Sequence, residues 1–340
     1  MKPVAEAVRR ARQVSGEERS RIAAFLHQHY DLPPVLGVRM MGSEADETLV
    51  IDGPSGPCAV LKVVGPAGME ATRLQVDLLE HLMGRPGVRV ARVLRSREGA
   101  SLVPVDLEGH EGTALMTTFC TGSALEDRPP SLDLVAHIAH SLAALQSALM
   151  SYPSTSAPVP GRHPWSLDAF PDHAGLIERH LEPATRDFAL GVLARFRSFT
   201  TLVRPQLEIQ ALHADYNLSN VLTDGRGVTA VIDFGDTVAA PRVYDVAIAL
   251  TYLTMQQPDL ADSVARTFVT AYLEHSALGA DELEALPLLI SVRALLVVLI
   301  GRESAARTPE RAAFALRYDA WAVALLERLA TPVELDPVTS

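Results

Sequence analysis

Two patterns of apolar residues divide the chain into a part rich in predicted strands and a longer part rich in predicted helices. From Val35 onward, short runs of β-forming residues are separated by turn residues such as Asp52-Gly53-Pro54, which is typical of hairpins. The strands predicted in this part cover 35–41, 48–51, 59–64, 90–96, 101–105 and 113–119. After the third strand, leucines at helical spacing predict a helix over 70–83 that ends at Gly84.

Helical spacing dominates the rest of the chain. Ser15 and Glu18 have the spacing of a capping box at the start of an N-terminal helix. Beyond residue 120, helices are predicted to about residue 330, interrupted by a proline-rich loop and by a small hairpin around Asp224-Gly225. We therefore predict an α+β fold with two lobes. It consists of N-terminal helices in 1–34, a strand-rich lobe with one main helix in 35–119, and a larger helical lobe in 120–335 that contains the hairpin.

The charge of the chain limits its partners. The formal net charge is −11, from 41 acidic and 30 basic residues. Binding of nucleic acid requires a basic face that neutralises phosphates, so this balance argues against a nucleic-acid partner. An acidic surface favours a cationic ligand by electrostatic steering, although the same charge also keeps a protein soluble without any further role.

The sequence gives little support for a membrane or an oxidising environment. The N-terminus is charged throughout and lacks the apolar core of a signal peptide. The most apolar run, Ala294 to Ile300, is much shorter than the about 20 residues that a spanning helix needs. We interpret it as a core helix and predict no membrane partner. With Cys58 and Cys120 as the two cysteines, we expect no disulfide framework and a cytoplasmic location.

The segment 213–236 contains the residues with the most specific chemistry, HADYNLSNVLTDGRGVTAVIDFGD. Asp215 lies two residues after His213 and five before Asn220, and Asp233 follows the predicted hairpin. Phosphoryl transfer needs metal ions that neutralise the phosphates and a carboxylate that orients the attacking hydroxyl and accepts its proton. Asp215, Asn220 and Asp233 supply oxygen atoms, which Mg²⁺ prefers. Each residue alone is explained as a turn or cap residue, but the combination favours a kinase.

This segment resembles the catalytic and metal-binding motifs of the aminoglycoside phosphotransferase and choline kinase group, within the protein-kinase-like fold. Protein kinases usually carry an arginine where this chain has Ala214, and they have an Ala-Pro-Glu motif that does not follow here. Tyr244-Asp245-Val-Ala follows instead, as is typical of small-molecule kinases, and we expect Asp245 to be the N-cap of a helix over 246–253. The resemblance covers about residues 35 to 300 and is closest to the hydroxylysine kinase-like branch.

The resemblance implies a bilobal protein-kinase-like fold, with a nucleotide-binding lobe in 35–119, a catalytic and substrate-binding lobe in 120–335, and ATP and Mg²⁺ as cofactors. Asp215 would be the catalytic base or the group that orients the hydroxyl, and His213 would support its loop. Asn220 and Asp233 would hold Mg²⁺. Asp236 would be either an acid behind the metal ligands or a substrate contact.

Lys62 lies in the apolar run Ala-Val-Leu-Lys-Val-Val, where a lysine is costly to bury without a charged partner. In the kinase fold this strand lysine pairs with the phosphates of the nucleotide, whereas the alternative is an edge-strand lysine that faces water. Ser43 and the amides around it would cover phosphate. The residues expected to contact the adenine base are Met116, Thr118 and Cys120. The candidates for the partner of Lys62 on the following helix are Glu70, Gln75, Asp77 and Glu80.

Ala214 and the missing Ala-Pro-Glu motif favour a small-molecule acceptor over a protein. The resemblance implies that this acceptor carries an amine, because acceptors in this superfamily often carry both an amine and a hydroxyl. Trp165 could stack on a cationic amine or be a buried anchor, and Asp168 is a second candidate substrate contact. We therefore predict a kinase for a hydroxylated amino acid or a similar amine-bearing metabolite. The alternatives are an antibiotic-modifying phosphotransferase and a nucleotide-binding pseudokinase that serves as an interaction module. The pseudokinase is disfavoured because the residues expected to act in catalysis and nucleotide binding are all present, namely Lys62, Asp215, Asn220 and Asp233.

Overall fold

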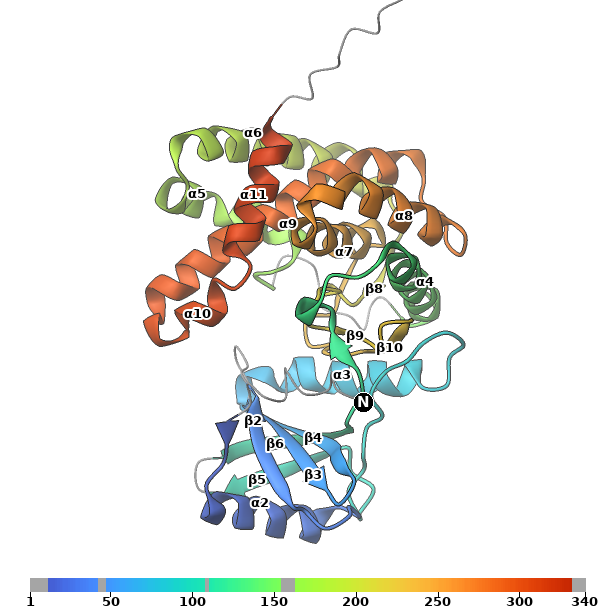
Figure 1. The fold of residues 1–340 in the computed structure, drawn as a ribbon, viewed down its shortest axis with the longest axis vertical. Helices are drawn as coiled ribbons and strands as arrows, with labels where there is room; N and C mark the ends of the chain where they lie inside the picture. The colour runs from blue at the N-terminus through green and yellow to red at the C-terminus, as the bar shows by residue number, and fades with distance from the viewer. Residues whose placement is uncertain (1–11, 42–46, 108–109, 154–162, 332–340) are drawn as a thin grey trace, which may run out of the picture. The chain divides into compact units, whose positions relative to one another are not determined.

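The computed structural model describes residues 12–41, 47–107, 110–153 and 163–331, in two compact units (Figure 1). The first unit comprises Met1–Tyr152 and Leu218–Thr237, and the second comprises Pro153–Asn217 and Val238–Ser340. The first contains β1 (Arg12–Gln13), α2 (Gly16–His29), β2 (Gly37–Met41), β3 (Glu47–Gly53), β4 (Gly56–Val64), α3 (Met69–Leu82), β5 (Leu102–Leu107), β6 (His110–Thr118), β7 (Ser123–Ala124), α4 (Leu132–Leu149), β9 (Val221–Thr223) and β10 (Val228–Val231). The second contains α5 (Ala174–His180), α6 (Pro183–Leu202), β8 (Ile209–Leu212), β11 (Val238–Pro241), α7 (Val243–Gln256), α8 (Ala261–Leu273), α9 (Ala280–Arg307), α10 (Ala312–Ala315) and α11 (Asp319–Ala330). Together they confirm the predicted α+β class.

The first unit is built on an antiparallel sheet with the strand order β1-β2-β3-β4-β6-β5. The helix α2 packs against this sheet through Ile22, Phe25 and Leu26, which share one core with buried strand residues such as Leu49 and Ile51. The strand residues of this core lie two positions apart, as do Leu49 and Ile51, because alternate side chains of a strand point to the same face of the sheet. The strand order places β4, the strand that carries Lys62, between β3 and β6.

The start of the described chain confirms one prediction and corrects another. The Ser15 hydroxyl accepts a hydrogen bond from the Glu18 N–H at 3.2 Å, and the Glu18 carboxylate accepts one from the Ser15 N–H at 3.3 Å, so the predicted capping box of α2 is present. Residues 1–34 were predicted to hold helices only, but Arg12 and Gln13 form β1. They pair with Met40 and Arg39, because the outer edge of β2 offers unpaired backbone groups.

A three-stranded sheet of order β10-β9-β7 completes the first unit. The hairpin β9–β10 lies where Asp224-Gly225 predicted a turn, and β9 also pairs with β7. The helix α4 contacts β10. The helix α4 also contacts α3, and the Val231 N–H of β10 donates to the Arg89 carbonyl. These contacts join residues 120–152 and the hairpin to the rest of the first unit, although the lobe boundary was predicted near residue 120 from the change in element type.

The strand predicted over 90–96 is absent, since this segment forms isolated bridges only, from Val90 to Val231 and from Val93 to Thr117. Its backbone bonds go to two different sheets. The Val231 N–H donates to the Arg89 carbonyl at 2.8 Å, and the Leu94 N–H donates to the Met116 carbonyl at 2.8 Å. A continuous ladder needs one partner strand, so the β-forming residues here make a connection instead.

Gly122 is a position where the backbone requires glycine. Its φ is +142°, and a Cβ there would lie 2.4 Å from the Thr229 hydroxyl and 3.0 Å from the Leu222 Cβ. We expect Gly122→Ala to lower the free energy of unfolding by about 2–4 kcal/mol, through strain and overpacking. Gly227→Ala is the control in the turn between β9 and β10, because a Cβ at Gly227 would meet open space. Urea unfolding of both variants checks this, and equal stabilities would contradict it.

Among its described residues, the second unit has helices and one pair of strands, β8 and β11. The helix α9 is central in it and contacts α6, α7, α10 and α11. The apolar run predicted to be a core helix lies within α9, and Ala294 to Leu299 are buried. This confirms that part of the prediction.

By length and composition, two helices in the described part of the chain could cross a membrane, namely α4 and α9. Of their apolar windows, 56% and 72% are buried inside the structure. Core helices pass the same test, so it is weak support for a membrane span. The absence of a membrane partner stays a prediction.

Candidate active site

The loop that carries Asp215 is held in an unusual backbone conformation. It follows β8, and Ala214 has a φ of +63°, which costs a non-glycine residue about 1–2 kcal/mol. The fully buried Asp245 carboxylate accepts hydrogen bonds from the His213 N–H at 3.1 Å and the Ala214 N–H at 2.8 Å. The Asp215 N–H donates to Nδ1 of the buried His213 at 3.2 Å. These bonds fix the backbone on both sides of Ala214.

Asp245 therefore does not have the capping role predicted for it. The helix α7 begins at Val243 with Arg242 as its N-cap, so Asp245 lies inside the first turn. The helix starts earlier than the apolar pattern indicated. Asp245 is the third residue of α7, and its carboxylate accepts hydrogen bonds from the His213 and Ala214 N–H groups. The sequence signal for this role is that Asp245 is the one charged residue of a mostly apolar helix.

Each oxygen of the Asp215 carboxylate accepts a hydrogen bond. Arg293 Nη2 donates to Oδ1 at 2.7 Å, and the Asn217 side-chain amide donates to Oδ2 at 2.8 Å. The Asp215 side chain is 19% exposed, whereas that of Arg293 is 1% exposed. Asp215 is thus a partly accessible carboxylate with a fixed orientation. Sequence reasoning did not identify Arg293, although a charged residue beside the run 294–300 indicated a buried partner.

In the first unit, Asp233 and Lys62 lie together. Asp233 follows β10 with a φ of +63°, and its Oδ1 lies 3.9 Å from the Lys62 ammonium. Lys62 pairs with Thr48 on one side and Leu115 on the other, so β4 is an interior strand. The alternative of an edge-strand lysine is therefore wrong. The side chains of Lys62 and Asp233 are 19% and 56% exposed, which leaves the carboxylate open to a ligand.

Asn220 lies directly before β9, and its backbone carbonyl accepts a hydrogen bond from the Ile232 N–H at 2.9 Å. This bond ties Asn220 to the residue before Asp233. A Cβ at Gly235 would lie 3.3 Å from Asp233 Oδ1 and 3.8 Å from the Lys62 ammonium, so glycine keeps the space beside this carboxylate open. An amide oxygen and an exposed carboxylate are donors that suit Mg²⁺, and the residues present fit such an ion.

Of the residues predicted to contact adenine, Met116 and Thr118 form backbone hydrogen bonds within the first unit. The Met116 carbonyl accepts from the Leu94 N–H at 2.8 Å, and the Thr118 N–H donates to the Arg92 carbonyl at 2.9 Å. These bonds favour a structural role for Met116 and Thr118. Cys120 packs against a small apolar cluster, and burial raises the pKa of its thiol above the usual value. An adenine contact at Cys120 stays a prediction.

Three further predictions concern residues around the nucleotide. Ser43 lies outside the described residues. Asp236 lies in the turn after Gly235 and is half-buried, and its role stays a prediction. Among the candidate partners of Lys62 on α3, Glu80 forms an ion pair with Arg95, which argues against that acid.

The two candidate substrate contacts, Trp165 and Asp168, have partners in the second unit. The Arg293 guanidinium lies 5.3 Å from the centre of the Trp165 ring, so the cation beside this indole belongs to the chain itself. Asp168 accepts hydrogen bonds from Arg204 Nη2 and from the Tyr244 hydroxyl, both at 2.7 Å. Burial, together with Asp168, raises the pKa of Tyr244 well above its usual value. These contacts support structural roles for both residues.

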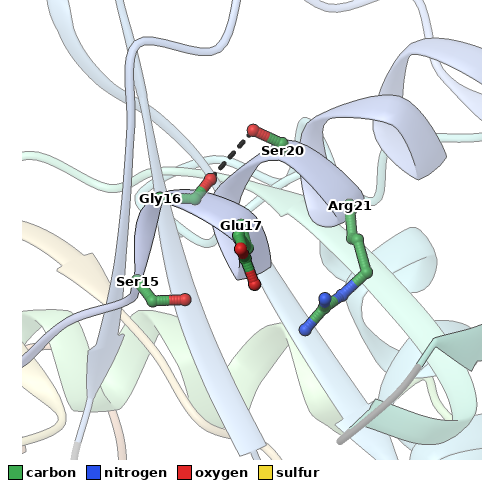
Figure 2. Close-up of a pocket in the computed structure, with 5 residues that line it drawn as sticks. All are labelled: Ser15, Gly16, Glu17, Ser20 and Arg21. Carbon is green, nitrogen blue, oxygen red and sulfur yellow. Dashed lines mark hydrogen bonds between the residues drawn. The ribbon is translucent and has the colours of Figure 1, made fainter.

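A hollow at the start of α2 holds none of the predicted site residues. Figure 2 shows its lining, Ser15, Gly16, Glu17, Ser20 and Arg21. The Ser20 hydroxyl donates to the Gly16 carbonyl at 2.8 Å, and the Ser15 hydroxyl caps the helix. The two serine hydroxyls thus form hydrogen bonds within the first turns of α2, and we assign the hollow no function.

Comparison with known proteins gives matches along most of the chain. The profile of the phosphotransferase enzyme family (APH) matches residues 40–286. A homoserine kinase of Pseudomonas aeruginosa (strain LESB58) is 28% identical over 283 residues, which are 81% of this chain and 83% of that protein.

Solved structures show the same fold. The amicoumacin kinase hAmiN, in complex with AMP-PNP, Ca²⁺ and Ami, superposes with a TM-score of 0.66 at 14% identity, over 93% of this chain and 95% of that chain. A microcompartment-associated aminopropanol kinase superposes with a TM-score of 0.60 at 20% identity, over 90% and 96%. These likenesses confirm the predicted bilobal protein-kinase-like fold.

Proposed function

Because the chain belongs to the phosphotransferase enzyme family and is a small-molecule kinase with a hydroxyl acceptor, we propose that it uses Mg-ATP to phosphorylate an amine-bearing metabolite. The acceptor is a hydroxylated amino acid of the size of homoserine. The observation that carries this proposal is the Asp215 carboxylate, which is partly exposed and oriented by Arg293 and Asn217. A kinase of this type needs such a group to orient the acceptor hydroxyl and take its proton.

The proposed roles follow from the contacts within each unit. In the second unit, Asp215 activates the hydroxyl, while His213 and Asp245 hold its loop. In the first unit, Lys62 attracts the phosphates of ATP. Asn220 and Asp233 would hold Mg²⁺, which neutralises phosphate charge when it is bound. The exposed Asp233 carboxylate and its 3.9 Å distance from the Lys62 ammonium support this assignment.

The proposed acceptor class rests on the curated relatives. The relative from P. aeruginosa is named as a homoserine kinase and aligns with 81% of this chain. Homoserine is a small hydroxyl compound that carries an amine. The aminopropanol kinase is 20% identical to this chain, so its likeness extends to the fold alone. A hydroxylated amino acid is a zwitterion, so the net charge of −11 does not steer it as it would steer a cation.

An antibiotic-modifying phosphotransferase is the second candidate. It is supported by structural neighbours such as hAmiN and a spectinomycin phosphotransferase. These neighbours are 14% and 12% identical to this chain, and that similarity extends to the fold alone. We therefore rank this candidate below the amino-acid kinase.

The experiment is ADP release from Mg-ATP with L-homoserine, DL-hydroxylysine, 1-amino-2-propanol, kanamycin and spectinomycin as acceptors. We expect kcat/KM to be highest with a hydroxylated amino acid. N-acetyl-L-homoserine is the matched control, because it keeps the hydroxyl and lacks the cationic amine. Turnover with the antibiotics alone would reject the proposed acceptor in favour of the second candidate. Binding of Mg-ATP without turnover of any acceptor would support the pseudokinase alternative.

A further inference from the structure

We propose that Arg293 is a positioning residue for phosphoryl transfer, because it fixes the Asp215 carboxylate in the orientation that the reaction needs. This proposal rests on the role of Asp215 in the proposed function. Arg293 Nη2 donates to Asp215 Oδ1 at 2.7 Å, across a sequence separation of 78 residues. The Asn217 amide holds the other oxygen at 2.8 Å. The plane of the carboxylate is therefore set by donors on both of its oxygens.

The Arg293 guanidinium is itself immobilised. Nη1 donates to the Trp165 carbonyl at 3.0 Å, and Nη2 also donates to the Tyr252 hydroxyl at 3.1 Å. The guanidinium carbon lies 5.3 Å and 5.4 Å from the centres of the Trp165 and Tyr252 rings. A planar guanidinium held at several points is a rigid support, whereas a lysine ammonium at the same place has fewer fixed directions.

Stability alone is a poor explanation for this arrangement. A buried ion pair stabilises a fold no better than well-packed apolar residues of similar volume, and Ala294 to Leu299, which follow Arg293, are apolar and buried. The arginine is placed against the acid that is proposed to activate the acceptor. Groups that act in catalysis must stay within about 0.5 Å of their productive position, which requires supporting hydrogen bonds of this kind.

The test compares Arg293→Lys and Arg293→Met with the wild type at saturating Mg-ATP. We expect kcat to fall about tenfold in the lysine variant, which keeps the charge. In the methionine variant we expect about a hundredfold loss, since a displacement of about 1 Å has that effect on rate. The KM values for ATP and acceptor should stay within about twofold, because a mispositioned base weakens the transition state and not ground-state binding.

Arg302→Met is the matched control on the same helix. Arg302 donates to both Asp319 oxygens and to the His180 carbonyl, so its loss removes an ion pair and a bond to the backbone, but neither of the hydrogen bonds that orient the Asp215 carboxylate. We expect lower stability and an unchanged kcat. An equal fall of kcat in Arg302→Met and Arg293→Met would overturn the proposal, as would an unchanged kcat in folded Arg293→Lys.

The proposal can still be tested if the Arg293→Met variant does not fold. Arg293→Lys and Asn217→Ala then decide, since Asn217→Ala removes the donor on the other Asp215 oxygen. An unchanged kcat in Arg293→Lys would again overturn the proposal, and a lower kcat in both variants would support it. If the wild-type enzyme phosphorylates no hydroxylated amino acid, the proposed acceptor class is wrong whatever the role of Arg293. In that case the rate of ADP release with water as the acceptor is measured for the wild type and both Arg293 variants. Equal rates in all three would overturn the proposal for Arg293.

Discussion

Asp215→Asn is expected to lower kcat by about a thousandfold, while the affinity for Mg-ATP stays close to that of the wild type. Loss of a positioned base costs about 10²–10⁴ in rate, and asparagine keeps the shape of the side chain without its basicity. Asp215 is held by contacts in the second unit, from Arg293 and Asn217. The proposed nucleotide ligands Lys62 and Asp233 belong to the first unit. Steady-state kinetics and nucleotide titration measure the two effects separately.

Asp233→Asn provides the contrast, because it removes a proposed Mg²⁺ ligand. We expect a loss of about tenfold or more in nucleotide affinity with Mg²⁺ present, equivalent to about 1.4 kcal/mol, and little change when the metal is chelated. Asp224→Asn is the matched control in the hairpin that precedes Asp233. The Asp224 side chain accepts bonds from the Arg226 and Gly227 N–H groups of its own turn. Equal losses of Mg-ATP affinity in Asp215→Asn and Asp233→Asn would reject this division of roles.

Local sequence signals were enough to predict several elements. The capping box at Ser15, the hairpin at Asp224-Gly225 and the apolar strand around Lys62 are all encoded by residues close together in the chain. Propensities and turn chemistry act at this range. The same signals could not predict where the segment 90–96 would pair, because its bonds go to two sheets formed by distant residues.

The support of Asp215 could not be read from local patterns either. Arg293 and Asp245 follow Asp215 by 78 and 30 positions, and only the packing of α7 and α9 brings them to the loop. What the sequence offered was Asp245 as the one charged residue of α7, and Arg293 in the middle of α9, whose other charged residues lie toward its two ends. A buried charge must find a partner, so such residues identify a site without identifying what they contact.

Asp245→Asn is expected to lower both stability and activity, although Asp245 touches neither nucleotide nor acceptor in the proposed mechanism. Its two oxygens accept the His213 and Ala214 N–H groups at 3.1 and 2.8 Å. An asparagine has one oxygen only, so one of these buried N–H groups would face an NH₂ group. Leaving a buried donor unsatisfied costs about 1–3 kcal/mol, and loss of the charge weakens the remaining bond. We therefore expect the free energy of unfolding to fall by about 3 kcal/mol.

Activity should fall with stability because the two bonds hold Ala214 at a φ of +63°. Without them the backbone relaxes toward negative φ, and Asp215, the next residue, moves with it. A displacement of about 1 Å lowers the rate by about a hundredfold. Asp262→Asn is the control, since Asp262 is an exposed acid of the second unit paired with Arg328, and exposed pairs contribute about 0–1 kcal/mol. Chemical unfolding and kcat at a temperature where both variants are folded test the expectation. An Asp245→Asn variant with wild-type kcat would show that the position of Asp215 does not depend on the two hydrogen bonds to the Asp245 carboxylate.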